Sequence, residues 1–471
     1  MESSLPIRLM TGISSCPVEV LHLIFSLLSP AEWHSLCLVN QKLREIAEPL
    51  LYSKIQWGWQ DHTKPPPIIP FLRSVTKRPE LASYVRSLKL EGKNRPRFGY
   101  WFPLFPIPVS ETELESEIAF IQSTGVPYSD LWIHEIRKGV TDALLALLLA
   151  QLSNLRFLDM QPVFLQRTTF IGMVLKSAIC DRGKYRLPDF HGLRDVSIIF
   201  REGWDIARVT EKFQETADLL PLFYLPNVEH LALSIRSQSV YKWPTEDLPG
   251  PPILKSLYLK SIREKHLSDI VPLARNLEKL TWKWYYDFDL KDDINKPVVD
   301  LDQIATALSL APPNLTEIKI KAAVELGGHD IDHPGVRLKG SLQQLANLHQ
   351  VKRLQIPFAF LVGFAEDTTK RLHDFLPRNI EILTLTYDLT EQDGQYETDI
   401  PEWDWEDEAI FELLQSWLKV WESCTPCLRG IRILQYPENG LGEWEPYLVD
   451  RLKLLSLQTG IQIDFALDEK E

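Results

Sequence analysis

Apolar residues crowd one stretch near the start of the chain, CPVEVLHLIFSLLSP at residues 16–30. Wound as a helix, this stretch has two apolar faces instead of one. The first face carries Val18, Leu21, Phe25 and Leu28, and the second carries Val20, Ile24 and Leu27. A surface helix needs only one apolar stripe to join a core. The second face therefore predicts a partner, and the pattern alone leaves open whether that partner is the rest of this chain or another protein.

Two more short helices are expected directly after this stretch. Ser29 can cap the second helix, Pro30 begins it, and Glu32 stands where a capping box needs its carboxylate. A third helix follows, in which apolar residues recur at helical spacing over residues 43–51. A unit of three short helices buries little surface on its own, so it needs a neighbour.

Beyond residue 80 the apolar pattern changes to copies of L-x-x-L-x-L, each preceded by a turn residue. The ten copies are YVRSLKL, NLRFLDM, GLRDVSI, NVEHLAL, ILKSLYL, NLEKLTW, NLTEIKI, QVKRLQI, NIEILTL and CLRGIRI. In each copy the last two apolar residues alternate along a short strand and point inward. No copy closes a core by itself, so the copies must stack into a curved solenoid. Helix-like runs at 140–154 and 301–314 predict an outer layer, and residues 460–467 predict a final strand.

Composition and charge fit a soluble globular protein. The chain has 471 residues, of which 45% are apolar and 24% charged, and its net charge of −13 disfavours nonspecific binding to nucleic acid or to anionic membranes. Its five cysteines are too few and too scattered for a secreted disulfide framework. We find no signal peptide, and the longest apolar run, 143–150, is too short to span a bilayer. We therefore expect an intracellular protein of the cytoplasm, the nucleus or both.

The N-terminal segment SCPVEVLHLIFSLLSPAEWHSLCLVNQKLREIAEPLLYSKIQW resembles an F-box. The matching positions are Pro17, Glu19, Val20, Leu21, Ile24, Phe25, Leu28, Ser29, Pro30, Leu36, Val39 and Leu43. In that family the F-box docks on a Skp-type adaptor, which links it to a cullin–RING ubiquitin ligase. The resemblance implies a set of residues that form or brace the adaptor interface, namely Pro17, Leu21, Ile24, Phe25, Leu28, Trp33, Leu36 and Val39. It also implies that another protein covers the second face of the first helix.

The repeated segments resemble the irregular leucine-rich repeats that follow the F-box in many fungal proteins. The expected fold class is therefore α/β: an all-α F-box-like unit, then an irregular leucine-rich-repeat solenoid with parallel strands on its concave face and helices on its convex face. The expected domains are the F-box-like unit at 13–57, a linker at 58–80 that Pro65, Pro66 and Pro67 hold extended, and the solenoid at 81–471, with insertions at about 91–140 and 387–408. The standard Asn or Cys after the third Leu position is missing, so no regular asparagine ladder is expected.

Motifs for catalysis or cofactor binding are absent from the sequence. There is no G-x-S-x-G, Walker loop, G-x-G-x-x-G or H-E-x-x-H pattern. Two weak metal candidates remain. One is Cys424 and Cys427, which lack matching further ligands, and the other is the loop with His329, Asp330, Asp332 and His333, whose flanking Gly and Pro also mark an ordinary loop. We expect neither a cofactor nor enzymatic activity.

Outward positions of the middle repeats predict a mostly basic band on the concave face. The band's members are Tyr258, Lys260, Lys279, Lys283, Lys319, Lys321 and Arg353. They either keep the surface soluble or recognise an acidic or phosphorylated segment of a target protein. The segment around 388–408 competes for this band, because no Lys or Arg occurs from Asn379 to Leu418 and acidic residues are dense there. It is either a solvated insertion or a segment that docks on the band or on a basic partner.

Together these patterns predict a non-catalytic substrate receptor. The F-box-like helices would bind a Skp-type adaptor, and the repeats would hold a protein target for ubiquitination by the associated subunits. The alternative is a free-standing repeat scaffold with a non-functional F-box, whose helices pack on its own repeats. A third and more distant reading is a metal-dependent enzyme that uses the His329–His333 loop.

Overall fold

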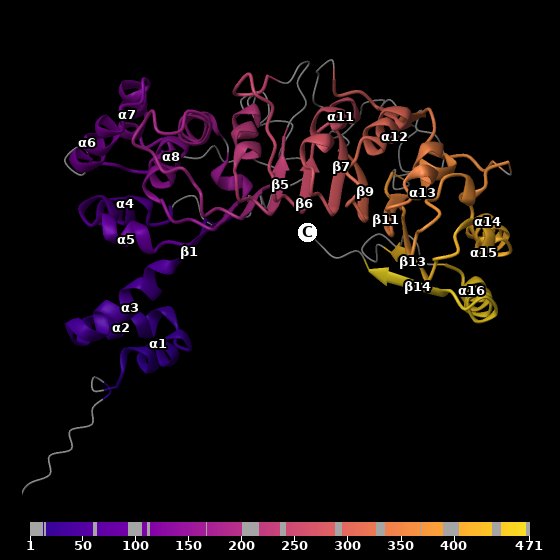
Figure 1. The fold of residues 1–471 in the computed structure, drawn as a ribbon, viewed down its shortest axis with the longest axis horizontal. Helices are drawn as coiled ribbons and strands as arrows, with labels where there is room; N and C mark the ends of the chain where they lie inside the picture. The colour runs from indigo at the N-terminus through magenta and orange to yellow at the C-terminus, as the bar shows by residue number, and fades with distance from the viewer. Residues whose placement is uncertain are drawn as a thin grey trace, which may run out of the picture.

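The computed structural model describes residues 13, 16–59, 64–92, 106–110, 114–165, 167–199, 216–235, 242–287, 294–325, 335–367, 369–389, 405–435 and 444–467. A helical unit at the N-terminal end is followed by an α/β region built on a parallel sheet. The elements of this region follow one another along an arch, and the N-terminal helices lie at one end of it (Figure 1).

The N-terminal unit has three helices and a small core of its own. The helices are α1 (Val18–Ser26), α2 (Pro30–Val39) and α3 (Gln41–Ser53). The predicted capping contact is present, since the backbone N–H of Ser29 donates to the Glu32 carboxylate at 2.6 Å. This hydrogen bond lowers the pKa of Glu32. The small core consists of Leu21, Phe25, Cys37, Leu43, Ile46 and Ala47, and it is separate from the large core of the sheet region.

The described part of the sheet region contains one open sheet of twelve strands in chain order, and every neighbouring pair is parallel. The strands are β1 (Lys54–Gly58), β2 (Ser87–Glu91), β3 (Phe157–Met160), β4 (Asp195–Ile198), β5 (His230–Ser234), β6 (Ser256–Lys260), β7 (Lys279–Asp287), β9 (Glu317–Glu325), β11 (Arg353–Pro357), β12 (Ile382–Thr386), β13 (Gly430–Gln435) and β14 (Gln462–Leu467). A separate two-stranded sheet joins β8 (Val298–Asp300) to β10 (Arg337–Lys339).

Helices and short 3₁₀ turns connect the strands, and in the middle of the region α11 and α12 lie along the outer side of the arch (Figure 1). The helices are α4 (Ile68–Lys77), α5 (Pro79–Tyr84), α6 (Glu115–Thr124), α7 (Ser129–Arg137), α8 (Thr141–Gln151), α9 (Thr169–Leu175), α11 (Leu267–Ile270), α12 (Leu301–Ser309), α13 (Phe358–Val362), α14 (Asp407–Leu418), α15 (Trp421–Cys424) and α16 (Pro446–Thr459). No described helix is long and apolar enough to cross a membrane.

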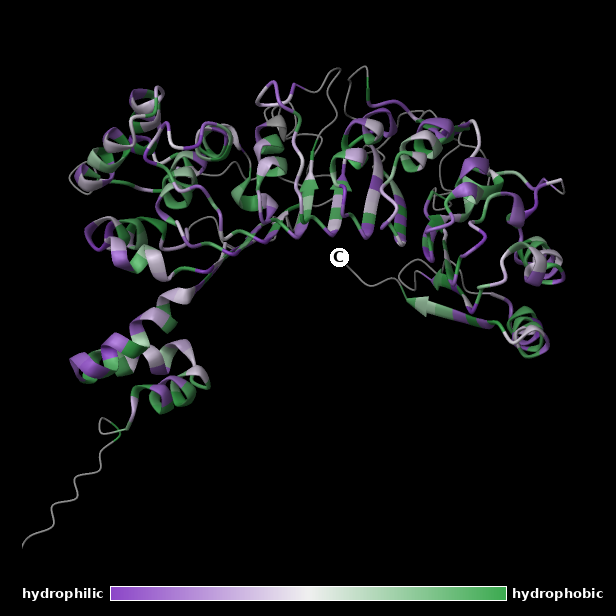
Figure 2. Cartoon of the chain, viewed as in Figure 1, coloured by the Kyte–Doolittle hydropathy of each residue, from purple (hydrophilic) through white to green (hydrophobic). Residues whose placement is uncertain are grey.

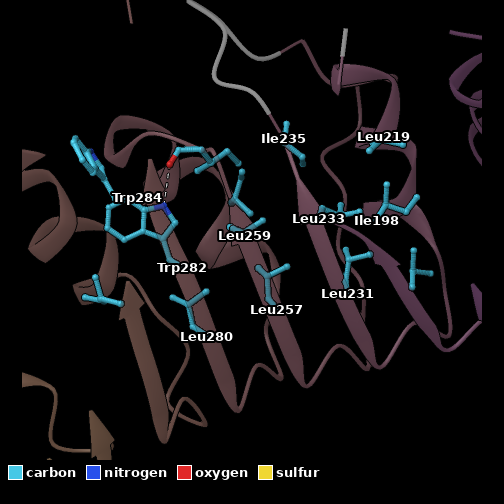
Figure 3. Close-up of a cluster of buried hydrophobic side chains, with 14 of the residues drawn as sticks. Ile198, Leu219, Leu231, Leu233, Ile235, Leu257, Leu259, Leu280, Trp282 and Trp284 are labelled. Carbon is cyan, nitrogen blue, oxygen red and sulfur yellow. Dashed lines mark hydrogen bonds between the residues drawn. The ribbon is translucent and has the colours of Figure 1, made fainter. Parts of the chain in front are cut away.

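All ten repeated motifs form strands of the sheet, and the three apolar positions of each motif are buried. Register aligns these positions from strand to strand. Leu231, Leu257 and Leu280 are partners in one row, and Leu233, Leu259 and Trp282 are partners in the next (Figure 3). The indole of Trp282 also donates to the backbone carbonyl of Ile262 at 2.9 Å. The final predicted strand is present as β14.

Asparagines before several strands brace one turn against the preceding one. The side-chain amides of Asn154, Asn227 and Asn379 donate to the carbonyls of Ser83, His191 and His349, each at 2.8 Å. Asn276 donates in the same way to Pro252. These contacts satisfy turn carbonyls that the ladder of strand hydrogen bonds does not reach. They form an asparagine ladder at a different motif position from the standard one.

Residues 58–80 differ from the extended linker expected there. The three prolines lead into α4, whose Ile68, Leu72 and Val75 are buried in the large core. Proline before or at the first turn of a helix costs little because the N–H groups there have no intrahelical partner. The apolar spacing after Pro67 therefore decides the local structure.

The segment 91–140, expected as an insertion, contributes to the large core where it is described. Helices α6 and α7 bury Ile121, Trp132 and Ile136 there. Residues 93–105 and 111–113 lie outside the described residues. So do residues 390–404 of the acidic segment, although Trp405 after them is buried, with its ring 5.4 Å from that of Phe358.

A buried carboxylate joins two helices of the outer layer. Asp142 lies in the first turn of α8 and accepts the backbone N–H groups of Phe170 and Ile171 at 2.8 and 3.1 Å. These two donors are at the start of α9, where N–H groups have no partner within the helix. Burial raises the pKa of Asp142 to about 6, although the two N–H donors oppose the shift.

We expect Asp142→Asn to lower the free energy of unfolding by about 1–3 kcal/mol, because its NH₂ group would face a buried N–H donor. Urea denaturation at neutral pH measures this loss. The control is Asp130→Asn, the same change at an exposed position in the first turn of α7. A loss equal to that of the control would contradict the bracing role.

The effect of Asp142→Asn on the free energy of unfolding should also depend on pH, and the direction of this dependence follows from the pKa of Asp142. The native pKa of Asp142 lies above the ordinary value of 3.8, so the native state binds this proton more tightly than the unfolded chain does. Its contribution to stability therefore falls as pH rises from about 4 to about 6 and is constant above that window. The stability difference between wild type and Asp142→Asn should narrow over this range. A stability difference that widens over this range would show that folding lowers the pKa of Asp142 instead of raising it.

Candidate protein-binding surfaces

The N-terminal unit leaves a cluster of apolar side chains exposed. The exposed residues, called here the apolar face, are Val20, Leu23 and Ile24 on α1, Leu27 directly after α1, and Leu38 and Val39 at the end of α2. Leu27 is 87% exposed and Leu23 is 70% exposed. Figure 2 shows hydrophobic residues along α1 at the end of the unit away from the sheet. Soluble proteins rarely expose such a cluster unless it binds something.

The predicted adaptor residues divide into exposed and interior groups. Ile24 and Val39 belong to the apolar face, and Pro17 is exposed just before α1. Leu21 and Phe25 are fully buried in the small core, so they hold α1 in place instead of meeting a partner directly. Three half-buried side chains, Leu28, Trp33 and Leu36, pack around that core.

Trp33 ties α2 to α1 in this unit. Its indole N–H donates to the backbone carbonyl of Phe25 at 2.6 Å, in the last turn of α1. Sequence reasoning missed Leu23 and Leu38, which are among the most exposed members of the apolar face. Their signal is helical spacing, since Leu23 lies four residues before Leu27 on the same side of α1.

The N-terminal unit is joined directly to the sheet. Helix α3 ends at Ser53 and strand β1 begins at Lys54, without an intervening loop. The guanidinium of Arg78 makes two hydrogen bonds with the Glu48 carboxylate of α3, at 2.8 and 2.9 Å. Bidentate pairs of this kind fix geometry as well as charge. The orientation of the helices relative to the sheet is therefore set by more than a single covalent connection.

The second candidate surface lies on the solvent-facing side of β6, β7, β9 and β11. Parallel register places Lys279, Glu317 and Arg353 in one row, and Tyr258, Thr281 and Lys319 in the next. Lys283 and Lys321 are partners one row further along. The structure thus brings the predicted basic band together across neighbouring strands, which lie about 4.8 Å apart.

Lys260 is the exception, because it is only 3% exposed. It occupies the last position of β6, where alternation predicts a solvent-facing side chain. Ser234 and Thr386 hold the corresponding last positions of β5 and β12 and are also buried. The ends of these strands are covered, so Lys260 cannot meet a partner on the open face.

A carboxylate lies within the basic band. Glu317 is 3.5 Å from the Lys279 ammonium, 3.4 Å from that of Lys319 and 3.9 Å from the Arg353 guanidinium. The Glu317 side chain is 14% exposed, whereas its three partners are 44–60% exposed. The three cations therefore converge on one anion and keep much of their surface in water.

The described residues give no candidate metal site to set beside these surfaces. No group of three or more His, Cys, Asp or Glu side chains in the described parts of the chain could hold a metal ion. The loop with His329 and His333 lies outside the described residues. All five cysteines, including Cys424 and Cys427, are free.

Comparison with protein families identifies the N-terminal unit. Residues 13–56 match the family described as F-box-like. Comparison of the chain with curated proteins gives no significant match. The matched residues span α1, α2 and α3 and run into β1, so the family assignment covers the unit that carries the exposed apolar face. The N-terminal helical unit of this chain is an F-box-like domain, followed by an α/β region with a parallel sheet.

Proposed function

We propose that this protein is the substrate-recognition subunit of a Skp–cullin–F-box ubiquitin ligase. The observation that carries the proposal is the apolar face of the F-box-like domain, which stays exposed while the domain keeps a separate core. Burying three such side chains is worth about 5–9 kcal/mol as an upper bound. A Skp-type adaptor is the partner that an F-box-like domain generally binds.

The same observation argues against a free-standing scaffold. In that alternative the F-box-like helices would pack their second apolar face on the sheet region of their own chain. Leu23, Ile24 and Leu27 are exposed instead, and the contact with the sheet region runs through α3 and Arg78. The proposed adaptor interface comprises Pro17, Ile24 and Val39 with their exposed neighbours, braced from within by Leu21 and Phe25.

For the sheet region we propose an irregular leucine-rich-repeat solenoid, over about residues 81–471. Its support is the chain-order parallel sheet, in which all ten motifs bury the same three positions. The target protein would bind the solvent-facing side, where Lys279, Lys319 and Arg353 are exposed side by side. The proposed ligand is an acidic or phosphorylated segment, which such cations bind by charge-assisted hydrogen bonds.

The proposed mechanism is proximity without bond chemistry by this chain. Holding a target near the ligase's reactive site converts an encounter between separate molecules into a local one. The direct passage from α3 into β1 and the paired contacts of Arg78 with Glu48 support a fixed geometry between adaptor and target. The proposed location is intracellular, where such ligases act.

The adaptor proposal is tested by Ile24→Asp combined with Leu27→Asp. Both side chains are exposed, so the domain should stay folded while adaptor affinity falls at least about 100-fold through lost apolar burial. Co-purification with a Skp-type adaptor measures the loss. The matched control is Leu131→Asp with Leu310→Asp, two exposed leucines of the sheet region. Undiminished adaptor binding by the double variant would refute the proposal.

The target proposal is tested by charge reversal at Lys279, Lys319 and Arg353, each changed to Glu. We expect the adaptor complex of this variant to lose the targets that the wild-type complex ubiquitinates, as measured by quantitative mass spectrometry of ubiquitinated peptides. The control reverses three exposed cations away from the sheet face, Lys176, Arg371 and Arg378, and produces the same change in net charge. Equal target loss in both variants, or none in either, would exclude the basic band as the binding surface.

A further inference from the structure

A row of mostly charged residues runs along the edge of the sheet where the strands begin. In each turn, one residue donates its backbone N–H to the carbonyl of its counterpart in the preceding turn. These residues, called here the turn ladder, are Arg86, Arg156, Arg194, Glu229, Lys255, Glu278, Thr316, Lys352, Glu381 and Arg429. Neighbouring members are about 4.8 Å apart, as the strands are, so their side chains can interact.

Charge alternates along most of the turn ladder. From Arg194 to Arg429, cations and carboxylates follow one another in turn, and Thr316 is neutral. Neighbours pair as this order allows, since the Glu229 carboxylate contacts Arg194 at 2.8 Å and Lys255 at 3.0 Å. These two cations lower the pKa of Glu229. Opposite charges on adjacent strands stabilise a sheet, so this part of the ladder neutralises itself.

The alternation fails at one end of the turn ladder, where Arg86, Arg156 and Arg194 follow one another. All three residues of this arginine cluster are exposed. The Arg86 guanidinium donates to the backbone carbonyl of Asn154 at 3.2 Å, and neither Arg86 nor Arg156 has a carboxylate partner among the described residues. Like charges on adjacent strands repel each other. This end of the ladder therefore carries a cost that the rest of it avoids.

The arginine cluster has defined ends. Toward the C-terminus it ends at Glu229, and toward the N-terminus the Arg86 N–H donates to the carbonyl of Ser53, the last residue of α3. The cluster thus lies between the F-box-like domain and β5 (Figure 1). Its three members span about 10 Å, the length of three residues of extended peptide. A nucleic acid strand would continue past this length onto Glu229, so a short anionic segment is the better fit.

An aromatic side chain adjoins the arginine cluster on the solvent-facing side of the sheet. Phe157 directly follows Arg156, is half-buried, and has Ser87 and Asp195 as register partners. The Asp195 carboxylate is 3.9 Å from the imidazole of His230 and is not paired with the cluster. Arginine and aromatic residues are enriched in protein interfaces. Their combination here suits a peptide in which an apolar residue adjoins an anionic one.

We propose that the arginine cluster binds a phosphorylated side chain in an extended segment of the target protein. A phosphorylated side chain carries a charge of about −2 at neutral pH and three acceptor oxygens. This charge matches the two guanidiniums that lack a carboxylate partner, whereas one carboxylate would match a single guanidinium. The planar fork of arginine also fits two phosphate oxygens at once. The inference rests on the proposed function in taking this segment from a target protein, and its site is separate from the basic band.

The test is retention of the purified full chain on immobilised peptide libraries with degenerate flanks and a central phosphoserine, glutamate or serine. We expect wild type to bind the phosphoserine library at least about 10-fold better than the glutamate library. Arg86→Gln with Arg156→Gln should lower retention on the phosphoserine library at least about 10-fold, because charged hydrogen-bond donors are lost. No preference for phosphoserine in wild type, or undiminished retention of the double variant, would overturn the inference.

The matched control is Lys352→Gln with Arg429→Gln. This pair removes two exposed cations from the same turn ladder, on the two sides of Glu381, and produces the same change in net charge. Its retention on the phosphoserine library should equal that of wild type. An equal loss in the control and in the arginine variant would show that net charge alone decides retention, which contradicts a specific site.

Two variants that test the proposed function separate it from this inference. Ile24→Asp with Leu27→Asp, and the charge reversal of Lys279, Lys319 and Arg353, should both keep wild-type retention on the phosphoserine library. This expectation holds whether or not the first variant loses the adaptor or the second loses ubiquitinated targets. Loss of retention in the charge-reversal variant would place phosphate binding on the basic band and overturn the inference.

Single changes at Arg156 distinguish recognition from a structural role. Arg156→Lys keeps the charge but lacks the planar fork, so its retention on the phosphoserine library should fall below that of wild type. In the absence of peptide, Arg156→Gln relieves repulsion within the cluster, so its urea midpoint at low ionic strength should equal or exceed that of wild type. A lower midpoint, or full retention by Arg156→Lys, would contradict phosphate recognition by this guanidinium.

Discussion

The parallel ladder of backbone hydrogen bonds is the constraint on which the rest of this structure depends. The ladder continues into the turns that precede the strands. There the Arg86 carbonyl accepts the N–H groups of both Arg156 and Phe157. The same pair of bonds recurs from repeat to repeat, as at Thr316 with Lys352 and Arg353. Because the register never slips, apolar residues align in rows on one side of the sheet and polar residues align on the other. Both the core and the basic band follow from this alignment.

Much of this arrangement could be predicted from the sequence, because a buried strand position repeats visibly. Three apolar residues at fixed spacing located ten strands, and the Ser29 and Glu32 pair located the start of α2. The asparagine ladder was also readable, since Asn precedes the first apolar residue in half of the motifs. The expectation of no such ladder was too narrow, because it considered only the position used in standard repeats.

The parts that could not be predicted are those where distant segments decide burial. Alternation assigns Lys260 to the open face, but the last positions of β5, β6 and β12 are all covered. Prolines suggested an extended linker, but the apolar spacing of Ile68, Leu72 and Val75 finds a core to join and forms a helix. Helices α6 and α7 join that core in the same way. A local pattern gives the preferred structure of a segment, and tertiary packing decides what surrounds it.

The position of Glu317 limits how the basic band could bind the proposed target. Three cations already share its carboxylate, so a single carboxylate from a target would mainly exchange one partner for another. Exposed pairs of this kind contribute roughly 0–1 kcal/mol each, which makes such an exchange nearly neutral. A favourable free energy of binding requires a target with more negative charge than Glu317 supplies, or contacts that are spread over several strands. The regular rows across β6, β7, β9 and β11 offer the second route, because Tyr258, Thr281 and Lys319 continue the surface beside the charged row. For the proposed target, an extended segment lying across the strands is therefore a better match to this surface than a single anionic group.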